Sequence, residues 1–141
     1  MRSRLSLSTE LRILIESKLE QTLNGIESTF SQILKKQDLT PIELKENIKN
    51  LEENFSIISQ KWSLEILYTL LLKKSAGFGE IKKILGVNSR TLSDKLKTLK
   101  HYEYIDRKVD NGPPLRVQYS LTDKGKNTVL LALPLLYYSS K

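Results

Sequence analysis

Residues 78–102 read FGEIKKILGVNSRTLSDKLKTLKHY, and the expected architecture follows from this stretch. Its first part has the apolar spacing of a short helix that begins at Phe78. The tight turn Gly86-Val87-Asn88 ends that helix, because its glycine suits the left-handed position after a helix. Ser89 is expected to cap a second helix that runs to about Tyr102. Two helices joined by a short turn with glycine predict a helix-turn-helix. Three apolar residues of the short helix are expected to face inward: Ile81, Ile84 and Leu85.

The elements on either side have the order of a winged helix. A helix that follows Lys61 is expected to bury these apolar residues: Trp62, Ile66, Leu67, Leu70 and Leu71. After the second helix, residues 104–109 and 116–121 alternate apolar and polar side chains around the turn residues 110–114, which predicts a hairpin. Thr122 is expected to cap a last helix. Helix, short helix, turn, helix and hairpin form the winged variant of the motif.

The N-terminal residues 1–59 predict two further helices. Ser8 or Thr9 is expected to cap a helix that continues to about Lys36. Thr40, Pro41 and Glu43 have the spacing of a capping box, which predicts a helix to about residue 56. Spacings of 4, 3, 4 and 3 place five apolar residues of the first helix on one heptad-like stripe: Leu19, Leu23, Ile26, Phe30 and Ile33. One helix cannot bury such a stripe by itself.

The expected fold class is therefore mainly α with a small β-hairpin (α+β), a winged helix-turn-helix domain flanked by long N- and C-terminal dimerisation helices. Residues 1–59 form the helical extension, 60–122 the DNA-binding domain and 123–141 the C-terminal helix. The stripe and the apolar last helix exceed what one small domain can cover, which indicates a homodimer. The expected dimerisation residues are the stripe with Leu131 and Leu135. The alternative is that the N-terminal helix folds back on its own domain.

Positive charge is concentrated in the C-terminal part of the chain. The net charge is +7. Residues 1–59 carry eight Lys and Arg against nine Asp and Glu, whereas residues 60–141 carry fifteen against seven. This distribution favours a polyanionic partner for the basic residues 60–141 and a role in packing for the nearly neutral residues 1–59.

The helix 89–102 is the expected DNA-reading element. Leu92, Leu96 and Leu99 form a narrow core face, and the opposite side is polar and basic. In this motif the N-terminal end of the helix points toward the bases of the major groove. Residues expected to enter the groove are Ser89, Arg90, Thr91, Ser93 and Asp94. Residues expected to bind phosphates are Lys95, Lys97 and Lys100.

Two of these residues have specific chemistry. Arg90 can donate two hydrogen bonds to guanine O6 and N7. Asp94 would repel a phosphate, so it either accepts a hydrogen bond from cytosine N4 or pairs with Arg90. Of these two roles we favour the ion pair.

The hairpin supplies a second basic element beside the helix. Arg107 and Lys108 precede its tip and Arg116 follows it, while Gly112-Pro113-Pro114 makes the tip stiff. Val117, Tyr119 and Leu121 are expected to face inward, which turns Arg116 and Gln118 outward. We expect a rigid basic hairpin to straddle the phosphate backbone and enter the adjacent minor groove. The contact residues expected there are Lys108, Asn111 and Arg116.

These motifs resemble the HxlR family of winged-helix regulators, with MarR regulators as relatives in fold. The stretches that carry the resemblance are KWSLEIL at 61–67, FGEI at 78–81, SRTLSDKL at 89–96 and PLRVQYSLTDKG at 114–125. The resemblance covers about residues 60–126. It implies sequence-specific binding of double-stranded DNA as a homodimer, with 89–102 as the recognition helix and 104–121 as the wing.

The chain departs from that family in two ways. Many relatives carry an N-terminal cysteine that senses oxidants, and this chain has no cysteine. Relatives also begin close to the Lys61-Trp62 helix, whereas here a long heptad-like helix precedes it. That extension favours an archaeal subgroup that dimerises through long helices.

Other functional classes have little support. His101 is the only histidine, and the chain lacks a glycine-rich phosphate loop and a Gly-x-Ser-x-Gly elbow. We therefore expect no enzyme, cofactor or metal site, and no residue requires a small-molecule effector. The longest apolar run, 129–138, is too short to cross a bilayer, and the first residues do not form a secretory signal. With no cysteine, this indicates a cytoplasmic protein.

Two other functions remain as alternatives to a transcription regulator. An architectural chromatin protein that coats DNA with little sequence preference would also have a basic half. A protein-interaction module that has lost DNA binding would use the helical extension. The base-reading side chains around Arg90 favour the regulator.

Overall fold

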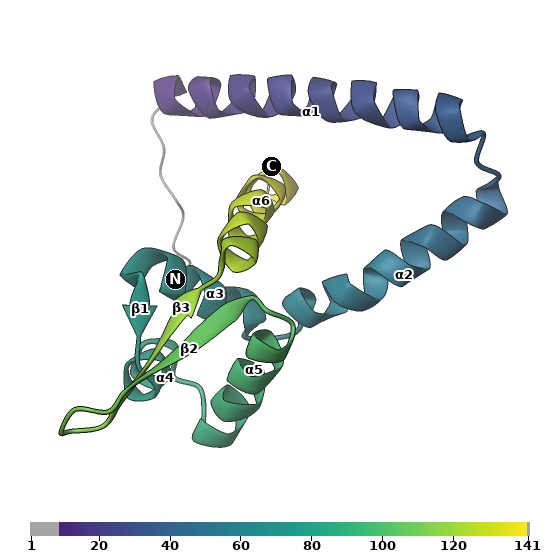
Figure 1. The fold of residues 1–141 in the computed structure, drawn as a ribbon. Coiled ribbons are helices and arrows are strands. Elements are labelled where there is room, and N and C mark those ends of the chain that lie inside the picture. The colour runs from purple at the N-terminus through teal and green to yellow at the C-terminus, as the bar shows by residue number, and fades with distance from the viewer. Residues whose placement is uncertain (1–8, 141) are drawn as a thin grey trace. The chain divides into compact units, whose positions relative to one another are not determined.

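The computed structural model describes residues 9–140 (Figure 1). The chain divides into two compact units, one up to Asn47 and the other from Ile48 onward. The first unit contains α1 (Thr9–Gln37) and the beginning of α2 (Pro41–Ser59). Ser8 lies outside the described residues, so its predicted cap stays a prediction. No helix within residues 9–140 combines the length and hydropathy that crossing a bilayer requires.

The break between α1 and α2 confirms the capping box. Asp38 adopts a positive φ of 47°, which ends α1. The Oγ1 of Thr40 accepts a hydrogen bond from the backbone N–H of Glu43 at 3.2 Å. The Glu43 carboxylate accepts one from the N–H of Thr40 at 3.3 Å. These reciprocal bonds satisfy two N–H groups at the start of α2, as the Thr40-Pro41-x-Glu43 pattern predicts.

The second unit holds the end of α2 and the winged helix-turn-helix. Its further elements are α3 (Ser63–Lys73), β1 (Ser75–Ala76), α4 (Phe78–Leu85), α5 (Ser89–His101), β2 (Ile105–Asp110), β3 (Arg116–Leu121) and α6 (Asp123–Ser139). The three strands form an antiparallel sheet in the order β1-β3-β2. The predicted hairpin is β2 and β3, whose register pairs Ile105 with Leu121 and Asp110 with Arg116.

Strand β1 is absent from the sequence-based prediction. It consists of Ser75 and Ala76, which pair with Ser120 and Tyr119 of β3. Two residues are too few to show an alternating pattern, so only the pairing with β3 identifies the strand. Ala76 is fully buried, and β1 therefore anchors the loop between α3 and α4 to the wing.

The core lies where the helices of the winged domain pack on the sheet. Leucine and isoleucine side chains from α3, α4 and α5 are buried there together with residues of the sheet and α6: Ile66, Leu67, Leu70, Ile81, Leu92, Leu96, Leu99, Ile105 and Val129. The predicted core face of α5 is thus confirmed. Trp62 is only half-buried against this core, because it precedes α3 with a positive φ of 77° rather than lying in the helix.

Two details of the helix-turn-helix differ from the prediction. The cap of α5 is Asn88, not Ser89, because the Asn88 Oδ1 accepts a hydrogen bond from the N–H of Thr91 at 2.8 Å. Ile84 was expected to face inward but is 52% exposed, since α4 is short and only Ile81 reaches the core fully. Gly86 does adopt the predicted left-handed conformation, with φ 68°.

Helix α6 begins at the predicted cap and passes very close to the sheet. The Thr122 Oγ1 accepts a hydrogen bond from the N–H of Gly125 at 3.0 Å. A Cβ at position 125 would overlap the backbone carbonyl oxygen of Tyr104. Gly125 is therefore required for α6 to approach the segment between α5 and β2.

Candidate DNA interface

Helix α5 presents one polar face away from the core. The Asn88 cap fixes its N-terminal turn, and the buried leucines fix its rotation about its own axis. Opposite these leucines, the exposed side chains are those of Arg90, Asp94, Lys97 and His101. The helix therefore offers a surface of cationic and hydrogen-bonding groups of the kind that fits the major groove.

The groove residues predicted from the sequence differ in exposure. Ser89, Arg90 and Asp94 are exposed, whereas Thr91 and Ser93 are half-buried at the flanks of the face. Among residues 9–140, Arg90 and Asp94 do not form the ion pair that we favoured. The other predicted role of Asp94, acceptance of a hydrogen bond from cytosine N4, stays a prediction.

The three lysines predicted to bind phosphates have different surroundings. Lys97 and Lys100 are exposed. Lys95 is half-buried, and its Nζ donates a hydrogen bond to the Oε1 of Gln60 at 2.7 Å. This bond ties α5 to the segment between α2 and α3, so Lys95 already has a structural partner within the chain.

The wing carries its cations on two faces. In the register of β2 and β3, Lys108 lies opposite Gln118, and Arg116 lies opposite Asp110, all on one face. Arg107 lies opposite Tyr119 on the other face, so the register separates Arg107 from Lys108.

The tip of the wing is exposed and locally ordered. Asn111 is exposed there, and the N–H of Gly112 donates a hydrogen bond to the Oδ1 of Asp110 at 3.1 Å. The hairpin extends from the domain with this tip at its far end (Figure 1). Its three predicted contact residues, Lys108, Asn111 and Arg116, are all exposed.

Helix α4 adds two exposed lysines that were not among the residues predicted from the sequence to contact DNA. Lys82 and Lys83 lie in its last turn and are exposed. The first helix of a helix-turn-helix crosses the DNA backbone, which makes these lysines candidate phosphate contacts. Their position in the last turn of the first motif helix is the signal that would have identified them.

An ion pair holds α4 against α3. The Nζ of Lys73 lies 2.9 Å from the Oε2 of Glu80. This side-chain hydrogen bond from Lys73 lowers the pKa of Glu80 below its ordinary value. Within residues 9–140, no three His, Cys, Asp or Glu side chains gather in a way that would hold a metal ion.

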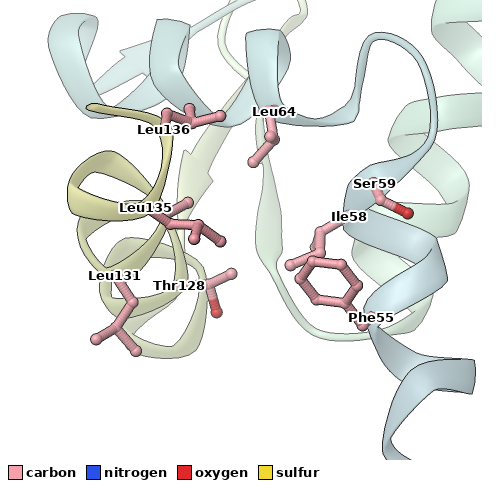
Figure 2. A pocket seen from close by; sticks show the side chains of 9 residues that line it. Phe55, Ile58, Ser59, Leu64, Thr128, Leu131, Leu135 and Leu136 are labelled. Carbon is pink, nitrogen blue, oxygen red and sulfur yellow. The ribbon is translucent and has the colours of Figure 1, made fainter. Parts of the chain in front are cut away.

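The predicted dimerisation residues of α6 border an apolar groove (Figure 2). Its walls come from the end of α2, from Leu64 of α3 and from α6, and its volume is about 320 Å³. Leu131 and Leu135 lie on the α6 wall, opposite Phe55 and Ile58 of α2 (Figure 2). Leu131 is 75% exposed and Leu135 is 57% exposed.

The groove offers almost no polar chemistry. Ser59 is one of its two hydroxyl-bearing residues, but its Oγ donates a hydrogen bond to the backbone carbonyl of Ser56 at 3.2 Å. The other is Thr128 of α6. A surface of this kind, apolar and exposed, is typical of a protein interface.

The stripe of α1 is also uncovered. Leu19 is half-buried, and the other four predicted residues are exposed: Leu23, Ile26, Phe30 and Ile33. The exposed fraction of Ile26 reaches 60%.

Comparison with known proteins agrees with this geometry. The family model described as HxlR-like helix-turn-helix matches residues 57–136. The uncharacterised HTH-type transcriptional regulator YdzF of Bacillus subtilis is 36% identical over 77 residues, which cover 54% of this chain and 71% of YdzF.

Two solved structures share the fold. The reduced form of the transcriptional regulator YodB from B. subtilis has a TM-score of 0.58 and 24% identity, covering 72% of this chain and 91% of that chain. A protein described as a MarR-family transcriptional regulator, from Enterococcus faecalis V583, has a TM-score of 0.57 and 28% identity, covering 65% and 83%. The predicted winged-helix fold and the predicted HxlR and MarR likeness are confirmed. The archaeal subgroup stays a prediction.

Proposed function

The chain belongs to the HxlR-like helix-turn-helix family, whose members are transcriptional regulators and not enzymes, and we propose that it reads a specific double-stranded DNA sequence as a homodimer. Helix α5 would lie in the major groove and the wing on the backbone and adjacent minor groove. We expect it to act in the cytoplasm, where bacterial and archaeal chromosomes lie.

The exposed face of α5 is the observation that carries this proposal. Arg90 stands at its N-terminal end, where a recognition helix meets base edges, and can donate two hydrogen bonds to a guanine. Asp94 lies one helical turn further and has no ion-pair partner among the described residues, so it is available to a cytosine N4 amino group. Ser89, Thr91 and Ser93 add short hydroxyl groups at the same end.

The phosphate contacts would come from lysines and the wing. On α5 they are Lys95, Lys97 and Lys100, and on the wing Lys108, Asn111 and Arg116. Each neutralised phosphate releases counterions, so the affinity should fall steeply as salt concentration rises. Lys95 would have to give up its hydrogen bond to Gln60 or share it with a phosphate.

Uncovered apolar surfaces support the homodimer. Leu131 and Leu135 border the groove of α6, and the stripe of α1 lies on a second helix. Burying a leucine side chain contributes about 1.5–3 kcal/mol, so a two-fold dimer would stabilise both helices. It would also set two recognition helices about 34 Å apart, one turn of DNA.

Selection of bound sequences from a random duplex library tests this function. We expect enrichment of one palindromic sequence, whose half-sites are separated by one turn of DNA. A gel-shift titration then compares the selected duplex with a shuffled duplex of equal length at the same salt concentration.

The outcomes separate the regulator from its alternatives. A selected duplex that binds at least a thousand times more tightly than the shuffled one supports a regulator. Affinities within about threefold of one another would instead identify an architectural protein, which binds mainly through phosphates. Failure to bind either duplex at low salt would contradict both.

A further inference from the structure

The stripe of α1 has a core composition that is unusual for a two-stranded coiled coil. Counting the 4, 3, 4, 3 spacing as a heptad places Leu23 and Phe30 at position a. Position d then holds Leu19, Ile26 and Ile33, and the polar Arg12 at d and Glu16 at a limit the apolar core to residues 19–33. In parallel coiled coils, isoleucine at a with leucine at d favours two strands, whereas leucine at a with isoleucine at d favours three or four.

The apolar surface of α1 is also wider than a two-stranded seam. Ile13 and Leu34 occupy position e, and Ile15 occupies position g, so apolar residues lie on both sides of the a and d rows. Ile13 is exposed, and Ile15 and Leu34 are half-buried. A stripe that extends beyond a and d suits a bundle in which each helix has two neighbours.

Small residues lie beside the stripe on the exposed face of α1, where a second neighbouring helix could approach closely. They are Thr22, Gly25 and Thr29, next to Ile26, Phe30 and Ile33 of the stripe. A Cβ at Gly25 would meet no atom within 4 Å. Glycine within a helix costs roughly 0.5–1 kcal/mol relative to alanine, and the close approach of another helix is a physical reason for it.

The charges beside the stripe suit a ring of equivalent helices. Glu20 and Glu27 occupy position e on one side, and Lys18 and Lys36 lie toward the other side. In an in-register parallel ring, Glu20 lies only two positions along the axis from Lys18 of the next helix, so these two opposite charges can meet. An antiparallel pair centred on Ile26 would instead bring Glu27 against its own copy.

We propose that α1 joins four copies of the chain in a helical bundle. The surfaces of α6, together with one contact between α1 helices, would pair the copies into DNA-binding dimers, and the remaining contacts of the α1 bundle would join two such dimers. A tetramer of this kind carries two pairs of recognition helices and can bind two duplexes at once. The bundle rests on the proposed function only in this last consequence.

Exchanging the core residues of α1 tests the bundle without removing apolar surface. The variant carries Leu23→Ile, Phe30→Ile, Ile26→Leu and Ile33→Leu, which gives isoleucine at a and leucine at d. Light scattering and sedimentation equilibrium over a range of concentrations measure the mass. We expect four times the chain mass of 16.2 kDa for the native protein and twice that mass for the variant.

A matched control changes exposed leucines elsewhere. Leu72→Ile with Leu115→Ile alters two exposed side chains of the second unit and should leave four copies. Ile26→Asp introduces a charge into the stripe and should also reduce the mass to two copies, which the α6 surface would still hold together. Ile26 is exposed within the described chain, so its substitution should leave the winged domain folded. Circular dichroism of the variant would check that its helices are retained.

The mass of the protein tests the α1 bundle, whereas binding of the selected duplex tests the proposed function. A native protein of two copies that still binds the selected duplex would overturn the bundle and leave the regulator intact. Four copies in the core-exchange variant would overturn the role of the a and d residues. Capture of a second, differently labelled duplex by the native protein, lost in Ile26→Asp, would support the bridging tetramer.

Discussion

The Nζ of Lys95 donates a hydrogen bond to the Oε1 of Gln60 at 2.7 Å and so joins the recognition helix α5 to the segment ahead of α3. Lys97 and Lys100 on the same helix are exposed. The lysines that the sequence groups together as phosphate contacts are therefore not equivalent.

This difference predicts unequal salt dependence. Lys97→Ala should lower the slope of log K against log salt concentration by about 1.8 for a dimer, because two phosphate contacts are lost. Lys95→Ala should lower this slope less, because Lys95 must break its hydrogen bond to Gln60 before it can bind a phosphate. Fluorescence anisotropy of the selected duplex at several salt concentrations measures both slopes. An equal loss for the two variants would contradict this ranking.

Arg90 should determine sequence preference more than general affinity. Arg90→Ala removes a side chain that can make two hydrogen bonds to guanine, and such a pair contributes about 1–3 kcal/mol of discrimination. We expect selection from a random library to give a relaxed preference at one position of each half-site. Arg90→Lys serves as the matched control, because it keeps the charge and loses the paired geometry. Unchanged selection with Arg90→Ala would exclude a base-reading role.

The stability of the recognition helix should depend on Asn88 and not on Ser89. Asn88→Ala removes the acceptor for the Thr91 N–H and should destabilise the protein by about 1 kcal/mol. Ser89→Ala changes an exposed residue in the first turn and should have less effect. Urea unfolding followed by circular dichroism compares the two. The reverse order would restore Ser89 as the cap.

Gly125 should tolerate no side chain. Gly125→Ala would set a methyl group against the carbonyl of Tyr104, which forces α6 away from the sheet. We expect a loss of more than about 2 kcal/mol and a lower Tm. Gly79→Ala in α4 is the control, because a Cβ there meets no atom within 4 Å. Similar Tm values for the two variants would show that α6 can shift at little cost.

Tyr68 should limit stability at alkaline pH. Its Oη is buried and has no hydrogen-bond partner among residues 9–140, and burial raises the pKa of Tyr68 above its ordinary value of 10.0. The folded state therefore holds the phenol proton more tightly than the unfolded state. The stability that this protonated phenol contributes to the folded state is fully present below the pKa of Tyr68 in the unfolded chain. It is lost as the pH rises through the pKa of Tyr68 in the folded protein.

Tyr68→Phe removes both the unsatisfied hydroxyl and its titration. We expect a gain of about 1 kcal/mol at neutral pH, because the cost of burying the hydroxyl disappears. The decline of the unfolding free energy above about pH 10 should become less steep. Tyr102→Phe, which changes an exposed tyrosine, is the control. A less stable Tyr68→Phe protein would show that the hydroxyl has a partner in solution.

The sequence predicted the parts of this protein that depend on neighbours along the chain. The leucine spacing of α5, the left-handed Gly86, the capping box at Thr40 and the cap at Thr122 are all local, and each is confirmed. Two local features were predicted wrongly: the residue that caps α5, and the ion pair between Arg90 and Asp94, which does not form among the described residues. Asn88 and Ser89 are adjacent residues that can both cap a helix, and the backbone at Asn88 is the extended one that capping requires.

Contacts between segments far apart in the sequence were decided only by the tertiary structure. Strand β1 exists because β3 lies beside Ser75 and Ala76, and the pairing of Lys95 with Gln60 spans 35 positions. The exposure of Ile84 and the separation of Arg107 from Lys108 depend on packing and on strand register. Periodicity along one chain specifies which face of an element is apolar, but not which partner covers it or which polar groups meet across the fold.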